Sequence, residues 1–284
     1  MLCLQNRVSG LLKTKVIGTT ALNGGCVGDV HRLRLADGSD VVAKTSQGDD
    51  HSLCIEGWML SYLKNHSSLP VPDVLHSDDH LLIMNYLDNS GYISTAAEHD
   101  AADHLAALHC VTTPTFGLQR NTAIGGLPQP NQASCNWLEF FRDQRLMHMG
   151  HHAHRVGRLP LEILAQLESF CNHLDRWIEE PAQPSLIHGD IWKGNVICKG
   201  NKISGFIDPA IYYADSEIEI AFTTLFDTFS DSFFSRYKEH RPTRPGFFST
   251  RKDIYNLYPL LVHAHLFGGG YVDRIRETLS RFGF

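Results

Sequence analysis

Residues 187–197 read IHGDIWKGNVI, and residues 203–210 read ISGFIDPA. A Lys-Gly-Asn turn at 199–201 joins the two apolar runs, which predicts a short antiparallel hairpin. Asn195 at the start of one strand and Asp208 at the end of the other should then lie at the same edge. Amide and carboxylate oxygens are ligands that Mg²⁺ prefers, and substrate phosphates can complete its coordination. The two residues therefore predict a magnesium site.

Asp190 precedes Asn195 by five positions on the loop that leads into this hairpin. A carboxylate there is placed to accept the proton of a hydroxyl and to orient that hydroxyl toward the γ-phosphate of ATP, as in the kinase template H-R-D-x-x-x-x-N. We assign Asp190 as the catalytic base and His188 as a brace of the loop. Taken alone, the spacing also fits a surface loop, because Asp and Asn favour turns.

Features upstream favour the kinase interpretation. Residues 16–44 alternate as a β meander that ends in Lys44, and residues 52–64 have the apolar periodicity of a helix. Glu56 falls on the apolar stripe of that helix. A charge there needs a partner, since an unpaired buried carboxylate costs several kcal/mol. We predict that Glu56 holds Lys44 and that Lys44 contacts the α- and β-phosphates of ATP.

The first turn of the meander is rich in glycine and contains Gly24, Gly25 and Cys26. Such a turn can bring backbone N–H groups close to phosphates, although glycines in a hairpin often serve turn geometry alone. An exposed thiol at Cys26 would be able to form an intermolecular disulfide that disables ATP binding. The alternative is a small residue that fills the turn.

The run 81–87 predicts a buried strand that ends in polar residues, so we place a boundary between two lobes near Asp88. Beyond it the pattern is helical. Thr95 and Glu98 have the spacing of a capping box, and further helices are predicted at 137–149, 161–178, 217–226 and 253–267. The fold class is α+β, with a small antiparallel-sheet lobe at 1–88 that binds ATP and a larger, mainly helical lobe at 89–284 that carries catalysis and the substrate.

Composition restricts the partners and the compartment. The 284 residues carry a net charge of −6, which argues against nucleic acid and anionic membranes as partners. Seven irregularly spaced cysteines without a CxxC pair do not resemble a disulfide framework. We read no export signal and no apolar run of about 18 residues. A cytoplasmic protein is expected.

Two further groups of polar residues admit a functional or a structural interpretation. A metal site at His148, His151, His152 and His154 is disfavoured, because no carboxylate or cysteine set accompanies them, and His109 is expected to be a satisfied core residue. Asp215, Glu217 and Glu219 stand at a predicted helix start, where they suit the helix dipole and can brace the catalytic loop.

The chain resembles the fructosamine (ketoamine) kinase family, a branch of the aminoglycoside- and choline-kinase-like superfamily with a protein-kinase-like two-lobe fold. The resemblance is carried by HGDIW at 188–192, by IDPA at 207–210 and by the Tyr212-Tyr213 pair that follows. It implies ATP-dependent phosphorylation of a sugar hydroxyl on ketoamines, with Mg²⁺, and a role in deglycation or protein repair.

The resemblance also implies residue roles. Asp190 is the base, and Asn195 and Asp208 are the metal ligands. Lys44 and Glu56 form the phosphate clamp. Met84, Asn85 and Tyr86 become the hinge that contacts adenine, and Trp192 becomes a candidate contact for the sugar. Cys26 also matches, so the chain is expected to be a monomer or a redox-dependent dimer.

Two alternatives stay open on the sequence. The residues shared across the superfamily do not choose the acceptor, so an aminoglycoside- or choline-type phosphotransferase is the nearest rival. A non-catalytic nucleotide-binding regulator is the second. Such a protein would be expected to have lost at least one of Lys44, Asp190, Asn195 or Asp208, and none is missing.

Overall fold

The computed structural model describes residues 2–22, 29–46 and 52–284. The predicted glycine-rich turn, with the candidate residues Gly24, Gly25 and Cys26, lies outside these ranges. No helix within them is both long enough and apolar enough to cross a membrane.

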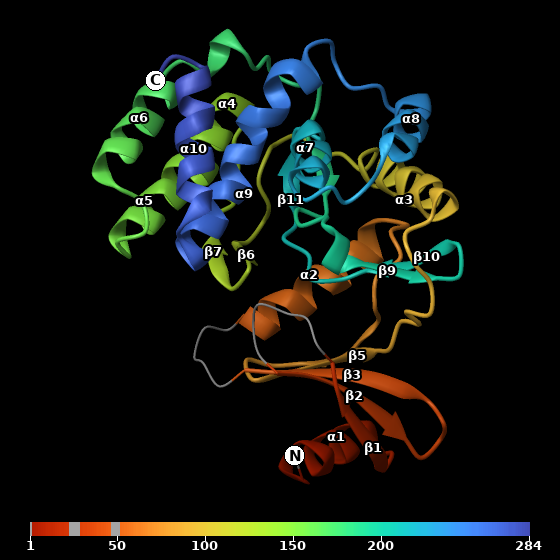
Figure 1. The fold of residues 1–284 in the computed structure, drawn as a ribbon. Helices are drawn as coiled ribbons and strands as arrows, with labels where there is room; N and C mark the ends of the chain where they lie inside the picture. The colour runs from red at the N-terminus through yellow and green to blue at the C-terminus, as the bar shows by residue number, and fades with distance from the viewer. Residues whose placement is uncertain (1, 23–28, 47–51) are drawn as a thin grey trace.

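The N-terminal part contains a five-stranded antiparallel sheet in the order β1-β2-β3-β5-β4. Its strands are β1 (Val16–Ala21), β2 (Asp29–Leu35), β3 (Asp40–Thr45), β4 (Val74–Ser77) and β5 (Leu81–Asn85). Two helices flank it, α1 (Leu2–Leu12) and α2 (Ser52–His66). Figure 1 shows α1 on the outer face of the sheet and α2 between the sheet and the rest of the chain. The meander and α2 were predicted, whereas α1 was not.

Two separate cores lie on either side of this sheet. A small one joins α1 to the outer face through side chains such as Val8, Leu33 and Ile83. The apolar side chains of α2, among them Leu60 and Leu63, belong instead to the main core that continues through the C-terminal part. The helix that carries Glu56 is therefore packed as part of the larger body.

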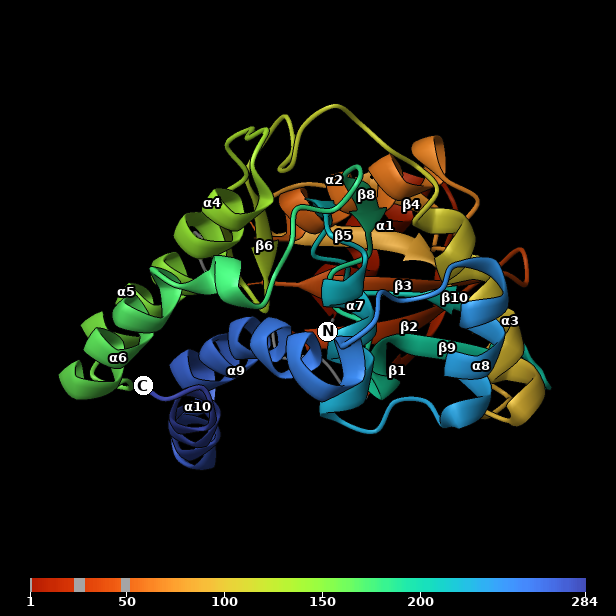
Figure 2. The same cartoon turned by 90° about the horizontal axis from the view of Figure 1, so that it is seen from above.

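The C-terminal part is mainly helical (Figures 1 and 2). Its α-helices are α3 (Thr95–Leu108), α4 (Trp137–Phe141), α5 (His148–Arg155), α6 (Leu161–Cys171), α7 (Glu217–Leu225), α8 (Asp231–His240), α9 (Lys252–Phe267) and α10 (Gly270–Arg281). Three two-stranded pairs complete it. They are β6 (Thr122–Ile124) with β7 (Leu127–Gln129), β8 (Ser185–Ile187) with β11 (Tyr212–Ala214), and β9 (Val196–Lys199) with β10 (Lys202–Phe206).

The predicted capping box at α3 is wrong. Ser94 is the N-cap, and its side chain accepts a hydrogen bond from the Ala97 amide at 3.3 Å. Glu98 is buried and instead accepts from the backbone amide and the hydroxyl of Ser230, at the start of α8. The Glu98 carboxylate, which the local pattern assigned to the helix cap, therefore binds Ser230, more than 130 positions away in the sequence.

The predicted helix bounds also need correction. The helix expected at 137–149 continues to Arg155, and residues 142–147 form a π-helical segment within it. The helix expected at 161–178 ends at Cys171, where Asn172 is the C-cap, and the chain continues into a single 3₁₀ turn. The helices near 217–226 and 253–267 are present as α7 and α9 within one residue of the predicted ends.

Candidate active site

The β8–β11 pair places two loops side by side. Ile187 ends β8 and pairs with Tyr212 at the start of β11, so His188 leaves one strand as residues 208–211 approach the other. The Ala210 amide donates to the His188 carbonyl at 2.7 Å and ties the loops together. The predicted base and one predicted metal ligand thus come from neighbouring loops.

The β9–β10 hairpin brings Asn195 to the same place. Val196 pairs with Phe206, and the Ile207 amide donates to the Asn195 carbonyl at 3.1 Å. Asn195 therefore lies beside the segment that leads to Asp208, as the hairpin predicted. It ends a short 3₁₀ turn and does not begin the strand.

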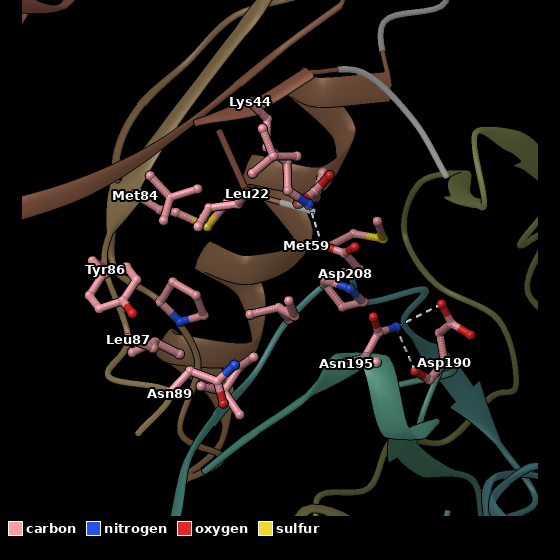
Figure 3. A pocket seen from close by; sticks show the side chains of 18 of the residues that line it. Leu22, Lys44, Met59, Met84, Tyr86, Leu87, Asn89, Asp190, Asn195 and Asp208 are labelled. Carbon is pink, nitrogen blue, oxygen red and sulfur yellow. Dashed lines mark hydrogen bonds and ion pairs between the residues drawn. The ribbon is translucent and has the colours of Figure 1, made fainter. Parts of the chain in front are cut away.

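Asn195 is buried and contacts Asp190 through both hydrogens of its side-chain amide. Nδ2 donates to the backbone oxygen of Asp190 at 2.9 Å and to its Oδ2, also at 2.9 Å (Figure 3). Burial raises the pKa of Asp190 to about 8, with a further contribution from the charge of Asp208, and the donation from Asn195 opposes both. A carboxyl group held in this way is suited to take a proton near neutral pH.

Lys44 on β3 is only 5 % exposed and lies between two carboxylates. Its Nζ is 2.6 Å from Oε1 of Glu56 on α2, so the predicted pair is present. Nζ also pairs with Oδ1 of Asp208. Burial disfavours the ammonium, but the two carboxylates outweigh burial and raise the pKa of Lys44. Lys44 therefore stays charged and connects the sheet to the C-terminal part.

Asp208 has a left-handed backbone conformation with φ of 55°. For a residue other than glycine this region costs on the order of 1 kcal/mol and persists only when the surroundings enforce it. Figure 3 shows its side chain pointing into the space between Lys44 and Asn195. The conformation thus aims the carboxylate at the predicted metal site.

The loop that carries Asp190 is held by its neighbours. Gly189 has φ of 86°, and a Cβ atom there would collide with the Ala210 carbonyl. Glu219 on α7 accepts from the Gly189 amide at 2.6 Å and from the His188 amide at 3.3 Å. The predicted bracing by an acidic residue of this helix is therefore present in Glu219.

Glu219 in turn contacts His109, which is fully buried as expected. His109 Nε2 lies 2.8 Å from Oε2 of Glu219, and its Nδ1 lies 2.7 Å from the hydroxyl of Tyr237. Burial alone would raise the pKa of Glu219, but contact with His109 outweighs it and lowers that pKa. The carboxylate is thereby kept charged, and a charged acceptor strengthens the hydrogen bonds to the loop.

His188 is also fully buried, and its Nδ1 accepts from the Asp190 amide at 3.3 Å. Burial lowers the pKa of His188 to about 4 against the charges of Glu219 and Asp208, so the imidazole is neutral at physiological pH. A neutral ring can accept this backbone hydrogen bond. His188 therefore braces its own loop, as predicted.

A cavity of about 310 Å³ lies between the sheet and the C-terminal part, and its lining includes Lys44, Glu56, Asp190, Asn195 and Asp208 (Figure 3). The predicted hinge residues Met84, Asn85 and Tyr86 line it, as does Trp192. The Trp192 indole lies over Gly194, where a Cβ atom would collide with the ring, and meets Phe226 edge to face at a centroid distance of 6.5 Å. Trp192 is 38 % exposed and thus accessible to a ligand.

One wall of the cavity was missed by sequence reasoning. Ala123, Gly125 and Gly126, from the β6–β7 hairpin, also line it. The stretch is rich in glycine and proline, and strands of three residues are too short for a period-2 pattern to be recognised. The Gly125-Gly126 pair, with positive φ at both residues, was the signal that could have indicated a tight hairpin.

A sequence model of the family described as fructosamine kinase matches residues 7–282. The chain belongs to the fructosamine kinase family. A Vibrio parahaemolyticus protein named provisionally as a ketoamine kinase is 29% identical over 277 residues, which cover 95% of this chain and 94% of that protein. The ketosamine-3-kinase of Mus musculus is 33% identical over 230 residues, covering 79% and 70%.

Solved structures have the same fold. A crystal structure from Thermobifida fusca, provisionally named a fructosamine-3-kinase, has a TM-score of 0.88 and 29% identity, covering 99% of both chains. The aminoglycoside phosphotransferase APH(4)-Ia, in a ternary complex with AMP-PNP and hygromycin B, has a TM-score of 0.69 and covers 99% of both chains. At 16% identity, the second similarity shows the fold alone. The protein-kinase-like architecture expected from the sequence is confirmed.

The side chains present fit the Mg²⁺ that family members are expected to use. Because Nδ2 of Asn195 donates to Asp190, the oxygen Oδ1 is the atom left for a cation. Asp208 supplies a carboxylate that its backbone directs into the cavity. One amide and one carboxylate oxygen form the donor set that suits Mg²⁺ when phosphates complete the coordination.

The other polar groups singled out in the sequence do not line the cavity. Asp215 and Glu217 pair with Arg244, and Glu217 also pairs with Arg251. The histidines at 148–154 lie on α5, where His148 and His152 pack against each other. No group of His, Cys, Asp and Glu side chains in the described ranges is arranged to hold a metal ion.

Proposed function

We propose that this protein transfers the γ-phosphoryl group of ATP to a sugar hydroxyl of ketoamines of the fructosamine or ribulosamine type. The observation that carries the proposal is the convergence of Asp190, Asn195, Asp208 and the Lys44–Glu56 pair on one cavity. Membership of the fructosamine kinase family supports the acceptor class.

Each residue has a distinct task in the proposed reaction. Asp190 accepts the proton of the sugar hydroxyl and orients its oxygen toward the γ-phosphorus in line with the leaving group. Lys44, fixed by Glu56, holds the α- and β-phosphates. The hinge at Met84, Asn85 and Tyr86 contacts the adenine. Catalysis comes mostly from positioning and charge neutralisation, without a covalent enzyme intermediate.

Asn195 and Asp208 would hold Mg²⁺. When bound, the cation neutralises charge on the β- and γ-phosphates. Lys44 also pairs with Asp208, so its ammonium offsets the repulsion between Asp208 and Asp190.

The acceptor side is assigned to the region around Trp192. Its exposed indole face offers a flat apolar surface against which the sugar of a ketoamine can pack. Phosphorylation at the sugar destabilises the ketoamine, which is then shed, so the proposed role is deglycation. A non-catalytic nucleotide-binding regulator is disfavoured, because it would be expected to have lost at least one of four residues, and Lys44, Asp190, Asn195 and Asp208 are all present.

An ATP-consumption screen tests the acceptor. Fructosyl-, ribulosyl- and erythrulosyl-lysine are compared with aminoglycosides and choline, and the Asp190→Ala protein serves as the control. Turnover with one or more ketoamines, absent in the variant, is expected. Turnover with only choline or an aminoglycoside would show that the acceptor belongs to the rival class and is not a ketoamine.

We further propose that the protein acts in the cytoplasm and that oxidation dimerises it through Cys26. The six cysteines in the described ranges are free, in keeping with a reducing compartment. Non-reducing gels of wild type and Cys26→Ala after peroxide treatment test the dimer. A dimer band in wild type alone is expected, and monomer bands in both would exclude it.

A further inference from the structure

The β6–β7 hairpin lies against the segment that follows Asp208. Its tip lines the cavity, and its base contacts residues 210 and 211. The base therefore connects a wall of the cavity to the loop that carries a predicted metal ligand. The contact is made by Gln129, the last residue of β7.

Gln129 is fully buried, with 0 % of its surface exposed, and uses both ends of its amide. Nε2 donates to the Ala210 carbonyl at 3.0 Å and to the Thr122 hydroxyl at 2.8 Å. Oε1 accepts from the Tyr258 hydroxyl at 2.7 Å. Because the Tyr258 O–H is directed at Oε1, the Nε2 hydrogens are directed at Ala210 and Thr122.

The peptide units around Ala210 are held from opposite sides. The Ala210 amide donates to the carbonyl of His188 in the catalytic loop, and its own carbonyl accepts from Gln129. Thr122, which accepts from Gln129, donates to the next carbonyl, that of Ile211, at 3.3 Å. The backbone just after Asp208 is therefore fixed by the catalytic loop on one side and by the hairpin on the other.

Asp208 needs such support. Its φ of 55° is a conformation that a non-glycine residue keeps only when neighbouring contacts enforce it. Ala210 follows Asp208 by two residues, and its carbonyl accepts the hydrogen bond from Gln129. The hydrogen bond from Gln129 is one of the contacts that can enforce this conformation.

We infer that Gln129 is a positioning residue for the metal site: it acts through the Ala210 carbonyl to hold Asp208 where Mg²⁺ is bound. The inference deepens the proposed function and rests on its use of Mg²⁺–ATP. It is independent of which acceptor receives the phosphoryl group.

The test replaces Gln129 with methionine, which has a similar length and no donor. A non-hydrolysable ATP analogue is titrated calorimetrically into the full-length protein at a series of Mg²⁺ concentrations and in EDTA. Mg²⁺ should increase the affinity for the nucleotide analogue, and the Mg²⁺ concentration that gives half of this increase should be about 10–100-fold higher in the variant. This is the usual effect of losing a group that supports a metal ligand. Affinity in EDTA should change much less than the Mg²⁺ requirement, because the Lys44–Glu56 pair and the hinge are retained.

Asn131 supplies a matched control. It is 1 % exposed and donates to the same Thr122 hydroxyl, while its Oδ1 accepts from Arg145, yet it makes no direct hydrogen bond to residues 208–211. Asn131→Leu should lower the melting temperature and leave the Mg²⁺ requirement unchanged. If Asn131→Leu raises that requirement as much as Gln129→Met does, the positioning role is excluded.

Tyr258→Phe is the second variant and removes one oxygen atom, so the fold is retained even if Gln129→Met is unstable. Without the Tyr258 hydroxyl the Gln129 amide loses its fixed orientation, and an increase in Mg²⁺ requirement smaller than that of Gln129→Met is expected. If Gln129→Met folds and its Mg²⁺ requirement equals that of wild type, the inference is overturned. If Gln129→Met does not fold, a wild-type Mg²⁺ requirement in Tyr258→Phe overturns it. Failure of the proposed acceptor would instead appear as absent ketoamine turnover with an intact Mg²⁺ response.

Discussion

Asn195 donates both hydrogens of its side-chain amide to Asp190, one to the backbone oxygen and one to the carboxylate, each at 2.9 Å. This contact fixes the orientation of the amide, so the proposed base and the proposed metal ligand are set by one pair of hydrogen bonds. The position of the proposed base is thereby coupled directly to that of a proposed metal ligand.

Asp190→Ala should lower kcat about 10²–10⁴-fold, the usual contribution of a positioned general base. ATP affinity should be retained, because Lys44 and the hinge are unchanged. Steady-state kinetics with the best acceptor, together with calorimetric ATP titration, measure both quantities. Asp143→Ala removes a surface carboxylate that is 56% exposed and should leave both at wild-type values. Full activity of Asp190→Ala would show that the base lies elsewhere.

Lys44→Met removes the ammonium between Glu56 and Asp208. We expect kcat to fall about 10²–10³-fold, as when one preorganised electrostatic contact to a reacting group is lost. ATP should bind more weakly, and a nucleotide titration measures the change. Lys64→Met removes an exposed lysine paired with Asp73 and provides the control. Unchanged ATP binding in Lys44→Met would contradict the assigned phosphate contact.

Gly189→Ala should damage both stability and activity, because a Cβ atom collides with the Ala210 carbonyl and φ is 86°. Gly157→Ala separates the two causes: its φ is 73°, but a Cβ atom there meets open space. We expect a loss of about 1 kcal/mol in the free energy of unfolding for Gly157→Ala, with normal kcat. Gly189→Ala should lose more stability and most of its kcat. Urea unfolding and kinetics measure these effects, and equal behaviour of the two variants would exclude the collision.

Asp78 predicts a pH dependence of stability. Burial would raise its pKa, but hydrogen bonds from His76, the His80 amide and Arg7 outweigh burial and lower it from 3.8 to about 2. A lowered pKa contributes stability above pH 3.8 that is lost as the pH falls toward 2. The pair with Arg7 is partly exposed, so Asp78→Asn should cost only about 0.5–1 kcal/mol at pH 7. Urea unfolding should show that this difference shrinks as the pH falls from 3.8 through 2, and a difference that stays constant over this range would contradict the lowered pKa.

The sequence predicted those parts of the site that local patterns determine. The β9–β10 hairpin has apolar strands and a Lys-Gly-Asn turn, so the approach of Asn195 to Asp208 followed from strand geometry. Glu56 was recognisable because a carboxylate on an apolar helical stripe demands a partner, and Lys44 is that partner. These predictions needed only the period of the pattern and the cost of an unpaired charge.

Other features depend on contacts that no local pattern specifies. The amide of Gln129 is set by Ala210 and Tyr258, which are 81 and 129 positions away. Helix α1 has Gly10 within it and polar residues around much of its surface, so its apolar side, with Val8, becomes evident only against the sheet. Glu98 was assigned to a local cap because its partner Ser230 lies on another element.

The packing of α2 into the main core has a consequence for control of the enzyme. In regulated protein kinases the helix that bears the glutamate of the Lys–Glu pair moves, and activation depends on bringing it into place. Here Tyr62 on α2 meets the hydroxyl of Tyr213 at 3.3 Å, and Trp58 on the same helix packs under the guanidinium of Arg120. These contacts anchor α2 to the C-terminal part while Glu56 on the same helix pairs with Lys44. We therefore expect the Lys44–Glu56 pair to form without a rearrangement of α2.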